Sequence, residues 1–147
     1  MSARKSMFQY GYRRAADQDS VAPAHHPVAI IGAGPVGLTL AIDLAQRNIP
    51  VVLLDDADRI GEGSRAICFA KKTLEVFDRL GCAAPMVEKG VRWSVGRVFR
   101  HEKEIYRFDL LPEGGHKMPA FINLQQYYVE GFLVDRVCDL PLIDLRW

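Results

Sequence analysis

The sequence has few of the residues that bind metals or form disulfides. Its three cysteines are far apart and odd in number: Cys68, Cys82 and Cys138. Its four histidines are scattered over segments expected to form loops or turns: His25, His26, His101 and His116. None of them forms a Cys-X-X-Cys pair or another spacing typical of metal ligands. We therefore expect no metal site, no disulfide framework, and reduced thiols in a cytoplasmic protein.

Long apolar runs and an excess of charge are also missing. No run approaches the roughly 18–20 apolar residues that span a bilayer. The 19 basic and 18 acidic residues give a formal net charge of +1, which predicts no binding to nucleic acid or to an acidic membrane surface. Residues 1–27 lack the apolar core of a secretory signal. Because Asp17 and Asp19 argue against a transit peptide, we expect a polar N-terminal arm there.

The chain does contain a strand–turn–helix–strand pattern. Val28–Ile31 is a short β-branched run, typical of a strand buried on both faces. A glycine-rich turn follows, and then Val36, Leu40 and Leu44 recur at helical spacing up to residues 47–48. The second apolar run, 49–54, predicts another buried strand. This is the length of a right-handed βαβ crossover, so the fold class is α/β and Rossmann-like.

The remaining chain predicts further elements. Residues 71–81 predict a helix that ends at Gly81, and 93–111 alternate in a manner typical of a β-hairpin insertion. We expect a third helix from Asn123, which buries Val129, Phe132, Leu133 and Val137 and ends before Pro141. Residues 142–147 predict a last strand.

The glycine loop carries the functional signal. Gly32, Gly34 and Gly37 form a GxGxxG motif between the predicted strand and helix. Gly32 permits the tight turn, Gly34 lets a pyrophosphate approach the backbone, and Gly37 lets the helix pack closely. Pro35 and Val36 open the helix, whose N-terminus favours negative charge. The motif predicts a dinucleotide site.

An acidic residue follows the second strand at the position expected for a ribose ligand. Asp55 lies at that strand end, where a carboxylate can accept both ribose hydroxyls. Asp56 is the alternative if the strand end is displaced by one residue. A carboxylate here argues against a 2′-phosphate, but the motif alone leaves FAD and NAD both open.

Three segments together resemble one enzyme family: "VAIIGAGPVGLTLAIDLAQ", "VVLLDDADRIGEGSRAICFAKKTLEVFDRLG" and "INLQQYYVEGFLVDRV". They are similar to the N-terminal part of the flavin-dependent aromatic hydroxylases, single-component FAD monooxygenases of the p-hydroxybenzoate and 3-hydroxyphenylpropionate hydroxylase type. The resemblance implies an enzyme that reduces FAD with NADH or NADPH and uses O2 to hydroxylate a phenol-like substrate. NAD(P)H would bind only transiently, as the reductant. The resemblance names no catalytic side chain, because the cofactor carries the chemistry.

The resemblance also implies two further cofactor-binding residues. Arg65 matches an arginine near the FAD pyrophosphate, and Gln126 matches a glutamine that contacts the flavin cofactor. Asp55 stands where most relatives have glutamate. From the residues alone, Arg65 could be a surface charge, and Gln126 could close a capping box with Asn123.

We expect the chain to be incomplete. It contains no later Gly-Asp flavin segment and no second sheet to cover the substrate, and it stops at the end of a predicted strand. Residues 28–147 are therefore expected to be the first part of an FAD-binding domain, truncated before its remainder and the substrate domain. Two alternatives stay open: a fragment of an NAD-linked dehydrogenase, and a non-catalytic nucleotide-binding remnant.

Overall fold

The computed structural model describes residues 8–61 and 65–147. These residues divide into two compact units, which we treat separately. The first contains residues 8–61 and Tyr127–Trp147, and the second contains Arg65–Gln126. The predicted α/β fold class is confirmed, since helices and strands follow one another along the chain.

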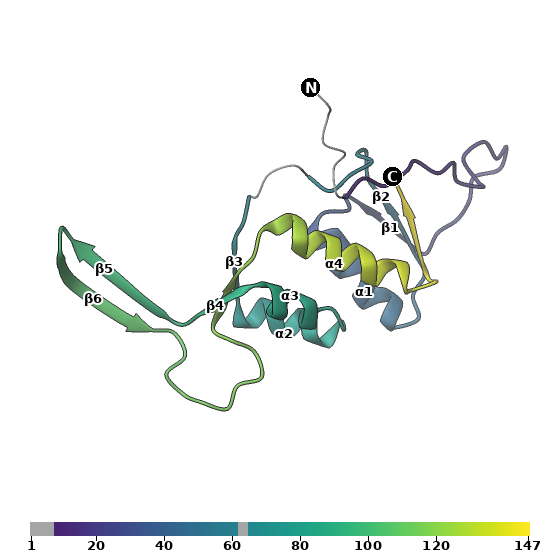
Figure 1. Cartoon of the computed structure of the whole chain (residues 1–147). Helices are drawn as coiled ribbons and strands as arrows, with labels where there is room; N and C mark the ends of the chain where they lie inside the picture. The colour runs from purple at the N-terminus through teal and green to yellow at the C-terminus, as the bar shows by residue number, and fades with distance from the viewer. Residues whose placement is uncertain (1–7, 62–64) are drawn as a thin grey trace, which may run out of the picture. The chain divides into compact units, whose positions relative to one another are not determined.

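A parallel three-stranded sheet forms the centre of the first unit (Figure 1). Its strands are β1 (Val28–Ile31), β2 (Val51–Leu54) and β8 (Ile143–Arg146), in the order β1-β2-β8. In register, Leu54 lies opposite Ile31 on one side and Arg146 on the other. All three carboxyl ends therefore meet at one edge, which is where α/β folds bind ligands.

Two helices connect these strands: α1 (Pro35–Gln46) and α4 (Gln126–Cys138). Both crossovers advance in the same direction through the sheet, so right-handed connections place both helices on one face. The helix predicted from the spacing of Val36, Leu40 and Leu44 is confirmed as α1, although Val36 and Leu40 are 82% and 46% exposed. The residues that the helix buries lie on another side: Gly37, Leu38, Ala41, Ile42 and Ala45.

The prediction that β1 is buried on both faces is wrong. Ile31 is 78% exposed, whereas the neighbouring Ile30 is only 8% exposed. Among the described strands, β1 pairs only with β2, so its second edge carries no neighbour to shield it. The second predicted strand is confirmed over Val51–Leu54, and three of its four residues are buried.

The second unit combines two small antiparallel sheets with two helices. Its strands are β3 (Cys68–Ala70), β4 (Val91–Trp93), β5 (Val95–Arg100), β6 (Lys103–Asp109) and β7 (Phe121–Asn123), and its helices are α2 (Lys71–Arg79) and α3 (Ala83–Lys89). The predicted helix corresponds to α2, and Gly81 after it has a φ of 82°. The central β7 joins β3 and β4.

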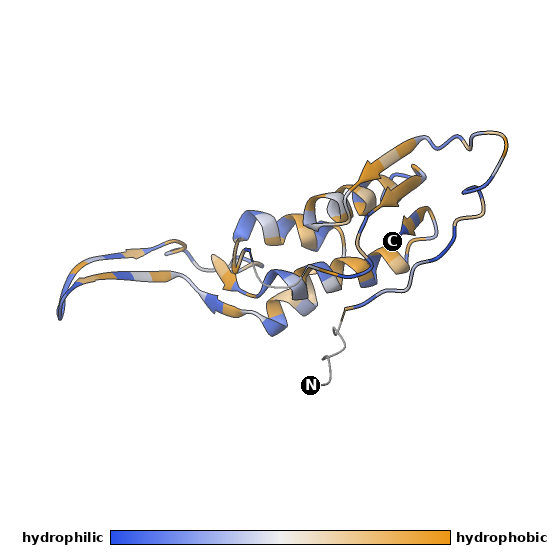
Figure 2. Ribbon diagram, turned by 90° about the horizontal axis from the view of Figure 1, so that it is seen from above, coloured by the Kyte–Doolittle hydropathy of each residue, from blue (hydrophilic) through white to orange (hydrophobic). Residues whose placement is uncertain are grey.

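The predicted hairpin corresponds to β5 and β6, which pair only with each other among the described strands. Figure 2 shows hydrophobic and hydrophilic residues mixed along both strands. The ring of Phe108 lies across the position that a Cβ on Gly96 would take, so a larger residue at 96 would have to displace that ring. Trp93 falls outside the hairpin, since it belongs to β4 and its indole stacks on Phe121 with ring centroids 4.9 Å apart.

The predicted start of the third helix is wrong by three residues. Asn123 is the last residue of β7, and its side-chain oxygen accepts a hydrogen bond of 2.8 Å from Nε1 of Trp93. The helix α4 begins at Gln126. Long-range pairing between strands determines this boundary, and a local capping pattern could not reveal it. The predicted stripe is otherwise confirmed: Val129, Leu133 and Val137 are buried, and Phe132 is half-buried.

Within the described residues, no helix combines the length and apolar character needed to cross a membrane. The three cysteines are free: Cys82 is buried, and Cys68 and Cys138 are exposed. No disulfide framework therefore contributes to this fold.

Candidate functional site

The glycine loop connects β1 to α1 at the carboxyl edge of the sheet. Gly32 has a φ of 102°, a left-handed conformation that favours glycine. Its N–H donates to the carbonyl of Leu54 at 2.7 Å, which ties the loop to β2. A Cβ on Gly37 would overlap the carbonyl oxygen of Gly32 and lie 3.3 Å from Cγ2 of Ile30. The helix can approach the loop this closely only because residue 37 is glycine.

Gly34 differs from the other two glycines of the motif. Its φ of −79° and ψ of −176° are accessible to any residue. A Cβ built on Gly34 would meet no atom of the described chain within 4 Å. Neither backbone conformation nor packing within the described protein therefore requires glycine here. The space above Gly34 is open to a ligand.

The N-terminus of α1 lacks the partners that usually satisfy a helix start. Gly34 is the N-cap and supplies no side-chain hydrogen bond, and the first turn contains no acidic residue. Pro35 occupies the first helical position, where a missing N–H has no consequence. The N–H groups of the first turn and the positive end of the helix dipole are thus available to an anion.

Asp55 connects the glycine loop to the segment after β2. Its Oδ2 accepts a hydrogen bond of 2.6 Å from the N–H of Ala33, and its Oδ1 accepts one of 2.9 Å from Ala57. A carboxylate offers about four lone-pair sites, so each oxygen keeps one for a ligand. Asp55 is half-buried and Asp56 is exposed. The hydrogen bond between Asp55 and Ala33 could not be predicted from the sequence, because the two residues are 22 positions apart and meet only through the tertiary structure.

Two hollows lie beside Asp55. One, of about 460 Å³, is lined by Ile31, Gly32, Leu54, Asp55 and Asp56. The other, of about 430 Å³, opens on the sheet face away from the helices and also includes residues of the N-terminal arm. The predicted residues Gly32, Asp55 and Asp56 therefore line one concave surface at the carboxyl edge, as expected for a nucleotide site in this fold class.

Arg65 and Gln126 are the first and last residues of the second unit. Arg65 is exposed, and no residue of the described chain forms an ion pair with it. Gln126 is half-buried and is the first residue of α4. The capping-box interpretation of Gln126 is wrong, because Asn123 lies in β7. The cofactor role implied for both residues remains a prediction.

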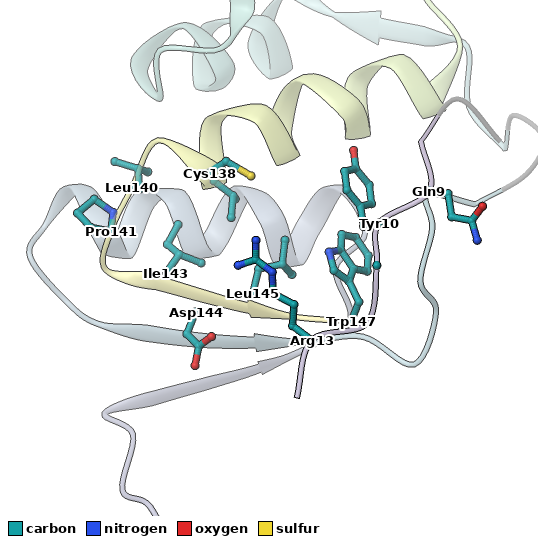
Figure 3. Close-up of a pocket in the computed structure, with 12 residues that line it drawn as sticks. Gln9, Tyr10, Arg13, Cys138, Leu140, Pro141, Ile143, Asp144, Leu145 and Trp147 are labelled. Carbon is teal, nitrogen blue, oxygen red and sulfur yellow. The ribbon is translucent and has the colours of Figure 1, made fainter. Parts of the chain in front are cut away.

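The N-terminal arm was predicted from the sequence, but its packing against this region was not. A groove of about 590 Å³ lies between the arm, the end of α4 and β8 (Figure 3). At its end the ring of Tyr10 stacks on Trp147, with centroids 4.9 Å apart and planes 5° from parallel. Burial, with the nearby Asp135 and Cys138, raises the pKa of Tyr10 to about 12. The arm is therefore packed against the sheet.

Comparison with known proteins decides the family. Residues 25–147 match the model of the FAD binding domain family. The chain belongs to this FAD-binding family. The chain is 34% identical over 118 residues to a flavin-dependent monooxygenase of Mycobacteroides abscessus, and the aligned region covers 75% of this chain and 25% of that protein. It is also 34% identical over 124 residues to 6-methylpretetramide 4-monooxygenase of Streptomyces rimosus, with 82% and 22% covered.

Solved structures agree with this assignment. The p-nitrophenol 4-monooxygenase of Pseudomonas putida superposes with a TM-score of 0.70 at 26% identity, over 83% of this chain and 31% of that one. The FAD-binding chain thus spans between about a fifth and a third of the length of these relatives. All three are named as monooxygenases, and the first as a flavin-dependent one, so they give no support to the NAD-linked dehydrogenase alternative.

Proposed function

We propose that the glycine loop and Asp55 bind the ADP part of FAD, and that the native-length protein is an NAD(P)H-dependent monooxygenase for a phenol-like aromatic substrate. The observation that carries the site assignment is the open space above Gly34. The described protein has no need for glycine at that position, whereas a pyrophosphate that approaches the backbone does.

The uncapped start of α1 suits the pyrophosphate. Gly34 and Val36 would present free backbone N–H groups to the phosphate oxygens. Pro35 has no N–H and would only start the helix between them. Gly32 and Gly37 would act indirectly, since they set the turn and the close packing that aim this helix end. The first turn of α1 contains no acidic residue, and the nearby Asp55 carboxylate accepts its hydrogen bond from Ala33, before the helix begins. The N–H groups of the first turn and the helix dipole therefore remain available to the phosphates.

Asp55 suits the adenosine ribose. With one lone pair on each oxygen used by Ala33 and Ala57, the carboxylate is held in one orientation and can still accept two hydroxyl hydrogen bonds. Asp56, exposed on the rim of the same hollow, is the second candidate for this contact. The family resemblance further implies that Arg65 would pair with the pyrophosphate and that Gln126 would contact the flavin cofactor.

The chemistry expected of the whole protein follows from the cofactor. The glycine loop and Asp55 would hold FAD, which would supply the redox chemistry of a monooxygenation: NAD(P)H is oxidised, one atom of O2 enters the aromatic ring and the other leaves as water. The residues of this chain would bind and orient the nucleotide, and none of them is assigned a catalytic role. The relatives named above include enzymes for a methylpretetramide and for p-nitrophenol, which supports an aromatic substrate. We expect the enzyme to act in the cytoplasm.

Ligand-dependent stability tests this proposal directly. The native-length protein should retain flavin on purification, and FAD at about 100 times its Kd should stabilise it by ~2.7 kcal/mol. NAD at the same concentration should give no comparable increase in Tm. Stabilisation by NAD alone would favour a dehydrogenase, and no response to either nucleotide would favour a non-catalytic remnant.

A further inference from the structure

The N-terminal arm contacts both ends of the segment that contains Asp55. The family match begins at residue 25, so most of the arm precedes it. At the far end of the segment, the N–H of Ile60 donates to the carbonyl of Phe8 at 3.1 Å, and the N–H of Tyr10 donates to the carbonyl of Asp58 at 2.7 Å. These bonds form a short antiparallel bridge between Gln9 and Arg59.

At the near end, the contact runs through Arg146 on β8. The backbone N–H of Asp55 donates to the carbonyl of Arg146 at 3.0 Å. The guanidinium of Arg146 contacts Asp17 of the arm, with Nη1 2.8 Å from Oδ1 and Nη2 3.0 Å from Oδ2. On its other side it contacts Asp144 at 2.6 Å. Arg146 therefore contacts the arm through its side chain and holds the backbone of Asp55 through its own carbonyl.

The Asp17–Arg146 pair is well placed to transmit this constraint. Both side chains are largely shielded, with exposed fractions of 21% and 20%, so the pair is less screened than a surface salt bridge. His26 lies 3.0 Å from Oδ2 of Asp17 and fixes the carboxylate from the end of the arm nearest β1. Hydrogen bonds from Arg146 and His26 lower the pKa of Asp17, so it is charged at neutral pH.

We propose that Asp17 is a positioning residue of the FAD site, which acts through Arg146 to hold Asp55 and, through Asp55, the glycine loop. The proposal rests on the proposed function, because it assumes that Asp55 contacts the cofactor. Its physical basis is continuous: arm carboxylate, guanidinium, backbone carbonyl, Asp55, and then the N–H of Ala33 in the loop. Because the backbone and the carboxylate of Asp55 are already held in place, Asp55 loses less conformational freedom when the ligand binds.

The test compares Asp17→Asn with Asp19→Asn in the native-length protein. Asp19 belongs to the same arm and pairs with Arg14, but both side chains of that pair are more than 60% exposed. The two variants thus remove the same charge from the same segment. Asp17→Asn should weaken FAD binding about fivefold, which is the lower end of the usual range for coupling between two separate sites, and Asp19→Asn should leave the Kd unchanged.

Hydrogen exchange provides a readout that does not depend on the cofactor. In Asp17→Asn, the amides of Ala33 and Ala57, both bonded to Asp55, should exchange faster, while amides in the centre of α4 keep their protection. Unchanged exchange at Ala33 and Ala57 would overturn the proposal, and so would faster exchange with no change in FAD affinity. Asp17→Glu, which keeps the charge, should recover most of the lost affinity.

A third variant separates this inference from the proposed function. If Asp55→Asn binds FAD as tightly as the unmodified protein, the assignment of Asp55 to the cofactor is wrong and the inference falls with it. If Asp55→Asn weakens FAD binding and Asp17→Asn does not, the cofactor site stands and only the role of the arm is refuted.

Discussion

Replacement of Gly34 by alanine should remove FAD binding without weakening the fold. The new methyl group would meet no atom of the described chain within 4 Å, and the backbone angles suit alanine. Two small effects on stability oppose each other. The loss of unfolded-chain freedom stabilises by about 0.4–1 kcal/mol, and alanine is a poorer N-cap than glycine by a similar amount. The free energy of unfolding should therefore change by less than ~0.5 kcal/mol.

The effect on the cofactor should be much larger. The methyl group would occupy the space through which the pyrophosphate must approach the backbone, and it would separate the phosphates from the N–H groups of α1. We expect FAD affinity to fall at least about a hundredfold, which corresponds to ~2.7 kcal/mol. Flavin absorbance of the purified protein and quenching of FAD fluorescence on titration would measure it.

Gly37→Ala provides the matched control. The same methyl group at this position would overlap the carbonyl oxygen of Gly32 and lie 3.1 Å from its carbonyl carbon, so the helix or the loop must move. We expect a loss of about 2–4 kcal/mol in unfolding free energy, measured by urea denaturation. Wild-type FAD affinity in Gly34→Ala would refute the site assignment. A loss of stability in Gly34→Ala as large as in Gly37→Ala would refute the claim of open space.

Three further predictions concern other parts of the chain. Because the folded-state pKa of Asp17 lies below its ordinary value of 3.8, the stability it contributes is present above that pH and is lost as the pH falls through the lowered value; an NMR titration that gives an ordinary or raised pKa would contradict this. Asn123→Ala should destabilise the protein by about 0.5–1.5 kcal/mol through loss of the Trp93 hydrogen bond, and an unchanged urea midpoint would argue against that bond. The isolated 147-residue chain should bind FAD weakly or not at all and show no hydroxylase activity, so purification with stoichiometric flavin would refute this expectation.

Local sequence patterns predicted the first unit well wherever chemistry and geometry are local. The strand Val28–Ile31, the glycine turn and the helix that follows are confirmed, because a β-branched run, a residue that must adopt positive φ and a helix-opening proline each act within a few residues. The position of Asp55 at the end of β2 follows from the same local order.

The errors occurred where burial or pairing depends on distant residues. The spacing of Val36 and Leu40 predicted the helix but not its buried side, because both residues are exposed and α1 buries residues such as Leu38 and Ile42 instead. Asn123 resembles an N-cap, yet pairing with β3 and β4 extends the strand through it. Neither outcome can be obtained from the local pattern, because both depend on contacts between separate segments.

The sequence by itself determined the nucleotide motif and its family resemblance, since three glycines and an acid at fixed spacing predict a turn, a close approach of a pyrophosphate and a ribose ligand. Only the tertiary structure distinguished the roles of the glycines, with packing at Gly37 and open space at Gly34. Only the structure connected Asp17 to Arg146, 129 residues away along the chain. Ion pairs over such separations depend on how strands and arm pack, and a linear sequence does not record that arrangement.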